Sequence, residues 1–250
     1  DRHYIYRIPG PGTELLINRQ QEKAVYDALN GLDISEKVIY FNGETGYKIA
    51  EFYEGAHNAD PSNREEIKRC MAVVRKFHKS GLKVDHSFDI RERIDFYEKL
   101  CKAHGDILFD DYAIVRKQMT ELLNQLDSLG HEKVLSHIDT VVDNFLMLPN
   151  GNIRLIDWEY SGMCDPLVDI SMCAIYSYYN EEDMERLFRL YLQREPSEDE
   201  LFALYANAAL GGFLWCLWAV YKSILGDEFG EYTIIMYRYA KKYYRKLRKL

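Results

Sequence analysis

Three residues with oxygen-bearing side chains share one short stretch of the sequence. Asp139 and Asn144 lie five residues apart in HIDTVVDN (137–144), and Asp157 follows thirteen residues later. Magnesium prefers a few such oxygen ligands and completes its shell with water and phosphate. A carboxylate beside it can accept the proton of an attacking hydroxyl. Taken singly, each residue is better explained as a turn cap or a strand end, but the full pattern points to phosphoryl transfer.

The segment between Asn144 and Asp157 predicts a β-hairpin that brings these two residues together. Asn150-Gly151 is a strong signal for a two-residue type I′ loop, because both central residues of that turn need a positive φ. With this loop, Phe145 faces Ile156 and Asn144 faces Asp157. Opposed Cα atoms in such a ladder lie about 4.5–5.5 Å apart. The register therefore predicts a shared magnesium site at the open end of the hairpin.

The elements around this hairpin indicate an α+β protein with two lobes. Strands are expected over 4–8, 38–42 and 46–53, around a helix over 14–29. Ser62-Asn63-Arg64-Glu65 matches a capping box and predicts a helix that Gly81 ends. Further helices are expected over 90–103, 112–129, 181–193, 198–225 with a break near Gly211-Gly212, and 231–247. The predicted division is a small β-rich lobe, 1–54, and a larger helical lobe, 55–250, with a ligand cleft between them.

The charge is unevenly distributed, which limits the classes of partner. The net charge is −8, yet the last thirteen residues hold seven Lys or Arg and no acid. The rest of the chain has 25 basic and 40 acidic residues, a balance of −15. Nucleic acid is therefore not expected as the main partner, because phosphate contacts need a basic surface. A cationic small-molecule substrate fits this balance better.

Cysteine usage and hydropathy favour a cytoplasmic protein without a membrane span. The five cysteines are scattered, odd in number and without a CxxC pair, which favours reduced thiols over a disulfide framework or a zinc site. No unbroken apolar run reaches about 18 residues. The first residues lack the charged start and apolar stretch of a signal peptide.

These motifs resemble those of a known family. HIDTVVDN resembles the catalytic-loop motif of the choline kinase and aminoglycoside phosphotransferase group, and IDWEYSG (156–162) resembles the metal-binding segment of choline kinases. The resemblance to the choline/ethanolamine kinase family covers nearly the whole chain and is closest to bacterial choline kinases. It implies a protein-kinase-like fold, ATP as co-substrate, Asp139 as the catalytic base, and Asn144 and Asp157 as Mg²⁺ ligands.

The resemblance also assigns supporting roles and reveals two departures. It implies that His137 buttresses the catalytic loop and that Asp169, in DPLVDIS, stabilises it. Choline kinases usually carry Asn where this chain has Ile138, which we expect to affect the hydrogen bonding of the loop more than the reaction. Tyr176 stands where relatives often have Glu, which removes one candidate anion for a cationic substrate.

At the start of the chain, the resemblance implies a nucleotide site. Arg7 on the first expected strand matches a basic residue that holds the nucleotide phosphates, and Glu22 on the following helix matches its partner. A surface arginine and a solvated glutamate would be the alternative. The family's glycine-rich hairpin is expected before Arg7, where the printed sequence has not yet begun, so the small lobe is expected to be partial. The segment PGPGT (9–13) lacks phosphate-loop spacing and predicts a turn.

Aromatic residues indicate how a substrate such as choline is held. A quaternary ammonium binds best to aromatic faces and nearby carboxylates. Trp215 and Trp218 are three apart and share one helix face, a spacing that an ordinary core would also give. The resemblance implies a choline site in which Asp139 and Glu159 supply negative charge and aromatic rings form the walls. Its expected members are Glu159, Tyr160, Trp215, Trp218, Phe229 and Tyr232.

The sequence thus favours ATP-dependent phosphorylation of the hydroxyl of choline, with other functions still open. An ethanolamine kinase would need more hydrogen-bond acceptors and fewer aromatic walls. An aminoglycoside kinase would need an open, strongly acidic groove. A non-catalytic binding protein on a kinase-like fold is a further alternative, although Asp139, Asn144 and Asp157 are all in place. A protein kinase is disfavoured, because no HRD, APE or activation segment is visible.

Overall fold

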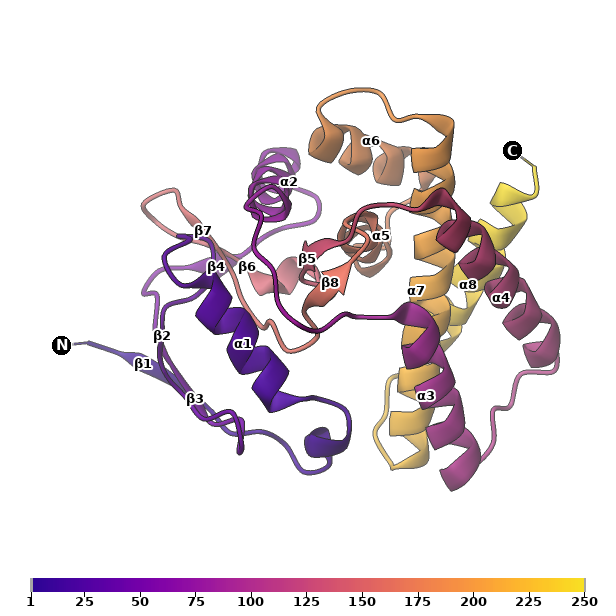
Figure 1. The fold of residues 1–250 in the computed structure, drawn as a ribbon, viewed down its shortest axis with the longest axis horizontal. Coiled ribbons are helices and arrows are strands. Elements are labelled where there is room, and N and C mark those ends of the chain that lie inside the picture. Colours follow the sequence, from indigo (N-terminus) through magenta and orange to yellow (C-terminus); the bar gives the residue numbers. More distant parts are fainter. Residues whose placement is uncertain (1, 250) are drawn as a thin grey trace.

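The structure, a computed structural model, describes residues 2–249 as a small β-sheet region joined to a larger helical part (Figure 1). An antiparallel sheet of order β1-β3-β2 forms the outer layer of the small region, and helix α1 lies against it. Tyr26 of the helix packs against Phe41 of the sheet, with ring centroids 5.6 Å apart. These elements are β1 (Tyr4–Arg7), α1 (Arg19–Leu29), β2 (Val38–Phe41) and β3 (Lys48–Glu51).

Short strands in the middle of the molecule carry the catalytic segment. One sheet has the order β4-β6-β7 and a two-stranded ladder joins β5 to β8. The backbone N–H of Leu155 donates to the carbonyl of Ile34 at 2.7 Å, which ties this sheet to the small region. The strands are β4 (His57–Asn58), β5 (Val134–Ser136), β6 (Phe145–Met147), β7 (Ile153–Leu155) and β8 (Gly162–Cys164).

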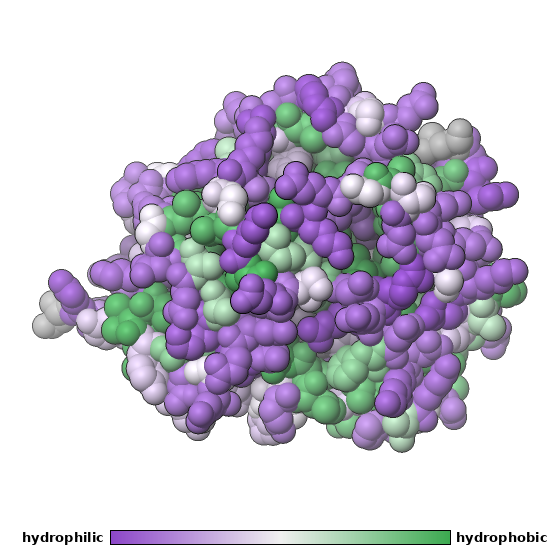
Figure 2. Space-filling model, viewed as in Figure 1, coloured by the Kyte–Doolittle hydropathy of each residue, from purple (hydrophilic) through white to green (hydrophobic). Residues whose placement is uncertain are grey.

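Helix α7 (Glu198–Ile224) is the centre of the helical part, and α3, α4, α5 and α8 pack on it. It begins with a capping box, in which Ser197 and Glu200 bond to each other's backbone N–H. By length and composition α7 could cross a membrane, but 83% of its most apolar window is buried inside the molecule. It is therefore the core helix of this fold, and the face seen in Figure 2 is mainly hydrophilic. The remaining helices are α2 (Arg64–His78), α3 (Ile90–His104), α4 (Tyr112–Leu129), α5 (Leu167–Tyr176), α6 (Glu181–Leu192) and α8 (Tyr232–Leu247).

Two helix starts differ from the sequence prediction. The helix expected from residue 14 is a short 3-10 turn, Thr13–Leu15, and α1 begins only at Arg19. The side chain of Asn18 accepts hydrogen bonds from the backbone N–H groups of Gln20 and Gln21, which caps the helix there. Helix α2 is capped in the same way by Asn63 and not by Ser62. Hydrophobic periodicity does not distinguish between such neighbouring caps.

Helix α5 was not predicted, because its sequence is mostly apolar and has no clear amphipathic period. All its residues from Leu167 to Ile175 are buried. A helix that is hydrophobic all round has no amphipathic period to detect, and it is stable only inside a core. This helix matters for function, since it carries Asp169 and ends at Tyr176.

The break predicted at Gly211-Gly212 is wrong, since α7 continues through both residues. A Cβ atom at Gly212 would lie 2.7 Å from the carbonyl oxygen of Met236 on α8. A Cβ atom at Gly211 would lie 2.7 Å from the sulfur of Met172 on α5. The two glycines therefore serve close helix packing, not a bend.

Substitution of these glycines should separate a backbone clash from a side-chain clash. We expect Gly212→Ala to lower the free energy of unfolding by about 1–3 kcal/mol, because the backbone of α8 must move. Gly211→Ala is the matched control and should cost less, since the flexible Met172 side chain can turn away and alanine favours the helix by about 0.5–1 kcal/mol. Urea denaturation of both variants measures the difference. An equal or larger loss in Gly211→Ala would contradict this account.

Candidate functional site

The hairpin that carries the site forms, but its predicted register is wrong by one residue. Phe145 faces Leu155 and Met147 faces Ile153. A two-residue loop at 150–151 would need the N–H of residue 149 to donate across the hairpin, and Pro149 has none. The N–H of Leu148 instead donates to the carbonyl of Asn152 at 2.9 Å. The loop therefore has three residues and ends at Gly151, which has φ 84°.

The corrected register places Asn144 opposite Ile156, whose N–H donates to the Asn144 carbonyl at 2.9 Å. Asp157 follows immediately, with φ 64° and a side chain that is 43% exposed. The amide nitrogen of Asn144 donates to the backbone carbonyl of Asp139 at 2.8 Å. Among the described hydrogen bonds, the side-chain oxygen of Asn144 accepts none, so both residues offer an oxygen to a ligand. The meeting of these two oxygens at one metal stays a prediction.

Asp139 lies beside Asn144 in an environment that changes its acidity. Its Oδ2 is 3.4 Å from the Asn144 amide nitrogen. Burial, with the nearby negative charge of Asp157, raises the pKa of Asp139 to about 7, against the opposing influence of the neighbouring Tyr176 hydroxyl. A carboxylate with a pKa near neutrality is well suited to accept and release a proton.

Asp169 clamps the backbone of the catalytic loop, as expected. Its carboxylate accepts the N–H of His137 at 2.9 Å and the N–H of Ile138 at 2.7 Å. The ring Nε2 of His78 donates to it at 2.9 Å. Ile138 has φ 74°, a left-handed conformation that is strained for a β-branched residue. The clamp therefore holds a conformation that the loop would not adopt on its own.

His137 supports the loop from the other side. It is fully buried, and its Nε2 donates to the carbonyl of Ile156 at 2.8 Å. Its ring packs edge-on against Trp158, with centroids 4.5 Å apart. Burial lowers the pKa of His137, so the ring is neutral at physiological pH. These contacts match the buttressing position that was expected for it.

Arg7 and Glu22 pair as expected. The Arg7 guanidinium donates to both Glu22 oxygens, at 2.6 and 2.9 Å, and Glu22 is completely enclosed. Arg7 Nη1 also lies 3.6 Å from Asp157 Oδ1. The pair therefore adjoins Asp157, and Arg7 has a positive charge available on that side. A role in holding nucleotide phosphates remains a prediction.

Arg19 also belongs to this group of charges, although no sequence motif predicts it. Its Nη1 donates to Glu22 at 2.7 Å and to Glu159 at 2.9 Å. Glu159, the carboxylate expected at the substrate, is thus paired with a cation of the protein. Burial and the charge of Asp157 raise the pKa of Glu159, against the influence of Arg19. The only sequence signal is that Arg19 precedes Glu22 by one helical turn.

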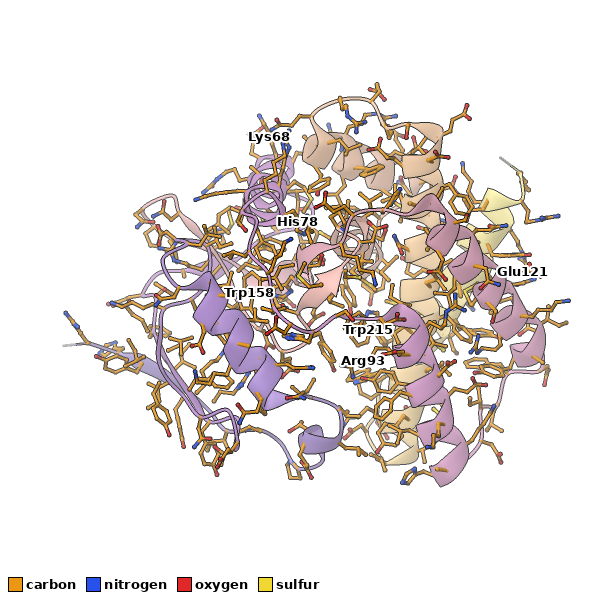
Figure 3. All side chains as sticks on the ribbon, in the orientation of Figure 1. Lys68, His78, Arg93, Glu121, Trp158 and Trp215 are labelled. Carbon is orange, nitrogen blue, oxygen red and sulfur yellow. The ribbon has the colours of Figure 1, made fainter. Side chains whose placement is uncertain are left out.

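The predicted aromatic residues form a continuous chain of ring contacts. Trp215, only 3% exposed, lies edge-on to Tyr160 at 5.2 Å and next to Trp218 at 6.1 Å between centroids. The chain continues from Trp218 to Phe229 at 5.0 Å and from there to Tyr232 at 6.3 Å. Figure 3 shows Trp215 on α7 in the central part of the molecule.

Tyr176 joins these rings to the predicted base. Its ring lies 6.2 Å from that of Trp215, and burial together with the nearby charge of Asp139 raises the pKa of Tyr176. From the sequence, Tyr176 is expected only to remove an anion. The structure places it at the contact between the aromatic cluster and the catalytic loop.

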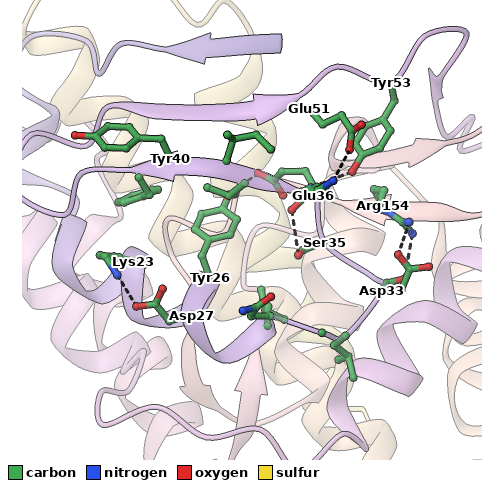
Figure 4. A pocket seen from close by; sticks show the side chains of 18 residues that line it. Lys23, Tyr26, Asp27, Asp33, Ser35, Glu36, Tyr40, Glu51, Tyr53 and Arg154 are labelled. Carbon is green, nitrogen blue, oxygen red and sulfur yellow. Dashed lines mark hydrogen bonds and ion pairs between the residues drawn. The ribbon is translucent and has the colours of Figure 1, made fainter. Parts of the chain in front are cut away.

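One described cavity lies away from these residues. It measures about 640 Å³ and opens between α1, β2 and Arg154. Its charged side chains are already paired, Lys23 with Asp27 and Arg154 with Asp33 (Figure 4). None of the predicted site residues lines it, and we assign it no part in the chemistry.

Several known proteins are similar to this chain in sequence and in structure. Residues 1–205 match the phosphotransferase enzyme family. The protein LicA of Haemophilus influenzae is 24% identical over 249 residues, which cover 92% of this chain and 90% of LicA. A probable ethanolamine kinase of Arabidopsis thaliana is 23% identical over 271 residues, covering 94% and 71%. The crystal structure of the choline kinase LicA from Streptococcus pneumoniae is 31% identical, with a TM-score of 0.88 over 98% of this chain and 87% of that one.

The family match covers most of the chain, and the structural match extends over both the sheet region and the helical part. The α+β kinase-like architecture predicted from the sequence is confirmed. The chain belongs to the phosphotransferase enzyme family, in its choline/ethanolamine kinase group.

Proposed function

We propose that this protein transfers the γ-phosphoryl group of ATP to the hydroxyl of choline. The observation that supports this most is the position of Tyr176, which lies near Asp139 and beside Trp215. A cation held against the aromatic rings would thereby have its hydroxyl close to a carboxylate of near-neutral pKa. Relatives named as choline and ethanolamine kinases support an amino-alcohol acceptor.

In this proposal Asp139 is the general base. It accepts the proton of the choline hydroxyl as the oxygen attacks the γ-phosphorus, and ADP leaves with the bridging oxygen. The pair of Arg7 and Glu22 holds the nucleotide phosphates in the cleft between the lobes, 1–54 and 55–250. Phosphoryl transfer depends mainly on positioning and charge stabilisation, and these residues provide both.

Asn144 and Asp157 would hold Mg²⁺. Among residues 2–249 no group of three His, Cys, Asp or Glu could bind a metal by itself. Two protein oxygens nevertheless fit magnesium, which keeps several waters and takes the rest of its ligands from phosphates. When bound, the ion neutralises the charge of the transferred phosphate.

Choline is favoured over ethanolamine by the aromatic walls. A primary ammonium needs three hydrogen-bond acceptors, whereas a quaternary ammonium has no N–H and prefers aromatic faces. In this proposal Trp215, Trp218 and Tyr176 would supply such faces. The five buried free thiols support our placement of the protein in the cytoplasm.

A direct assay separates the candidate functions. The purified protein with Mg-ATP is offered choline, ethanolamine or kanamycin, and ADP release is measured. We expect the highest kcat/KM with choline. A preference for ethanolamine or kanamycin would change the acceptor, and no turnover with any of them would favour a non-catalytic binding protein.

Substitution of Trp218 tests the aromatic site. We expect Trp218→Leu to weaken choline binding by about 2- to 30-fold, because one aromatic face contributes about 0.5–2 kcal/mol to a bound cation. Nucleotide affinity should change much less. Isothermal titration with choline and with its neutral isostere, 3,3-dimethylbutanol, measures the effect. Equal losses for both ligands would mean that Trp218 provides only shape and apolar burial.

A further inference from the structure

The charged groups beside Asp157 form one connected cluster. Arg7 and Arg19 both donate to Glu22, and Arg19 also donates to Glu159. Arg7 Nη1 is 3.6 Å from Asp157 and 3.9 Å from Glu159. Two guanidinium groups therefore face three carboxylates, and the cluster can take up further positive charge.

The partners of Arg19 are not equally dependent on it. Glu22 keeps both oxygens on Arg7, at 2.6 and 2.9 Å, if Arg19 moves away. Glu159 has no comparable second cation, because Arg7 is 3.9 Å away. Arg19 can therefore leave Glu159 while the buried carboxylate of Glu22 stays paired with Arg7.

Gly46 lies against both arginines, and a side chain at this position would clash with Arg19. A Cβ atom there would lie 2.8 Å from both Cδ and Nε of Arg19. The carbonyl of the same glycine accepts from Arg7 Nη2 at 3.1 Å. The turn thus keeps both guanidinium groups close to the place where the nucleotide phosphates are expected.

We propose that Arg19 is a positioning residue that exchanges partners during binding. It pairs with Glu159 before the nucleotide enters and turns to the phosphates when the nucleotide arrives. Glu159 is then free to attract the ammonium of the acceptor. The inference rests on the proposed function for the identity of the acceptor. Its consequence is positive coupling, so that nucleotide and cationic acceptor each strengthen the binding of the other.

Coupling is measured by titrating choline with and without Mg-AMP-PNP. For the wild type we expect the nucleotide analogue to tighten choline binding at least about five-fold, the lower end of typical coupling. Arg19→Gln should bind choline more tightly than the wild type without nucleotide, and coupling should fall below about two-fold. Arg19→Lys keeps the positive charge and should retain part of the coupling. Wild-type coupling in Arg19→Gln overturns the proposal.

Two controls exclude a general structural effect. Lys23→Gln removes an exposed ion pair on the same helix, with Asp27, and should leave coupling at its wild-type value. The neutral isostere 3,3-dimethylbutanol should show no coupling in the wild type, because it carries no charge for Glu159 to attract. Coupling of the isostere equal to that of choline would assign the effect to closure of the site, and would contradict an exchange of ion pairs.

A double-mutant cycle on nucleotide affinity tests the same exchange of partners without any acceptor. The Kd of Mg-AMP-PNP is measured for the wild type, Arg19→Gln, Glu159→Gln and the double variant. Glu159→Gln should tighten nucleotide binding, and this gain should largely disappear when Arg19 is also replaced. Equal gains in both backgrounds would refute the exchange. Absence of turnover with choline and ethanolamine would instead refute the proposed function and leave this cycle informative.

Discussion

Asp139→Asn should lower kcat by about 10²–10⁴-fold, the usual contribution of a general base. The amide cannot accept the hydroxyl proton, although it is nearly isosteric with the carboxyl group. Nucleotide affinity should change little, because Asp139 acts on the acceptor and not on the nucleotide. Steady-state kinetics with choline and titration with a nucleotide analogue measure the two quantities separately.

Asp143→Asn is the matched control for this variant. Asp143 lies in the same segment, is exposed, and makes no described side-chain hydrogen bond. We expect its kcat to stay close to that of the wild type. Near-normal kcat in Asp139→Asn would remove Asp139 from the mechanism, whereas equal losses in both variants would point to disturbance of the loop.

Asp169→Asn should cause the largest loss of stability, about 3–5 kcal/mol, because it breaks a fully buried charged network. The wild-type carboxylate accepts from His78 and from the N–H groups of His137 and Ile138. In the variant, the NH2 group of the Asn amide would face one of these N–H donors. The strained backbone at Ile138 could then lose its hydrogen-bond acceptor. For a chain of this size the melting temperature should fall by about 6–20 °C.

The same substitution predicts a pH dependence. Burial alone would raise the pKa of Asp169, but the hydrogen bond from His78 and the donors of the loop hold it below its ordinary value. A carboxyl group with a depressed pKa in the folded state stabilises the fold at every pH above its unfolded-state pKa of about 3.9. This stabilisation is lost as the pH falls through the folded-state pKa. The difference between wild type and variant should therefore shrink below about pH 4.

Chemical denaturation of Asp169→Asn from pH 7 to pH 3 tests both statements. Asp127→Asn is the control, since Asp127 forms an exposed pair with Arg91 and should cost at most about 1 kcal/mol. A loss that stays constant with pH would show that the charge of Asp169 is not its source.

Several features of this protein followed from the sequence alone. The spacing of Asp139, Asn144 and Asp157 indicated phosphoryl transfer, and the family resemblance implied the two-lobed architecture that the comparisons confirm. Helices with an amphipathic period were placed well, as at α4, where the predicted range 112–129 matches Tyr112–Leu129. Such features depend on residues that are neighbours in the chain, and their period is visible without a partner.

The remaining features depended on contacts between distant residues, which no local pattern encodes. Only the fold shows that Gly212 makes room for α8, and that α5 is buried on all sides. The hairpin register followed from one missing N–H at Pro149, which outweighed the Asn-Gly turn signal.

The site itself shows the same division. Tertiary packing brought Tyr176 from the end of α5 to Asp139, and Arg19 from α1 to Glu159, which is 140 residues further along the chain. The sequence alone determined which chemical groups are available and which local elements carry them. The tertiary structure decided which of those groups meet, because burial and charge act through space and not along the chain.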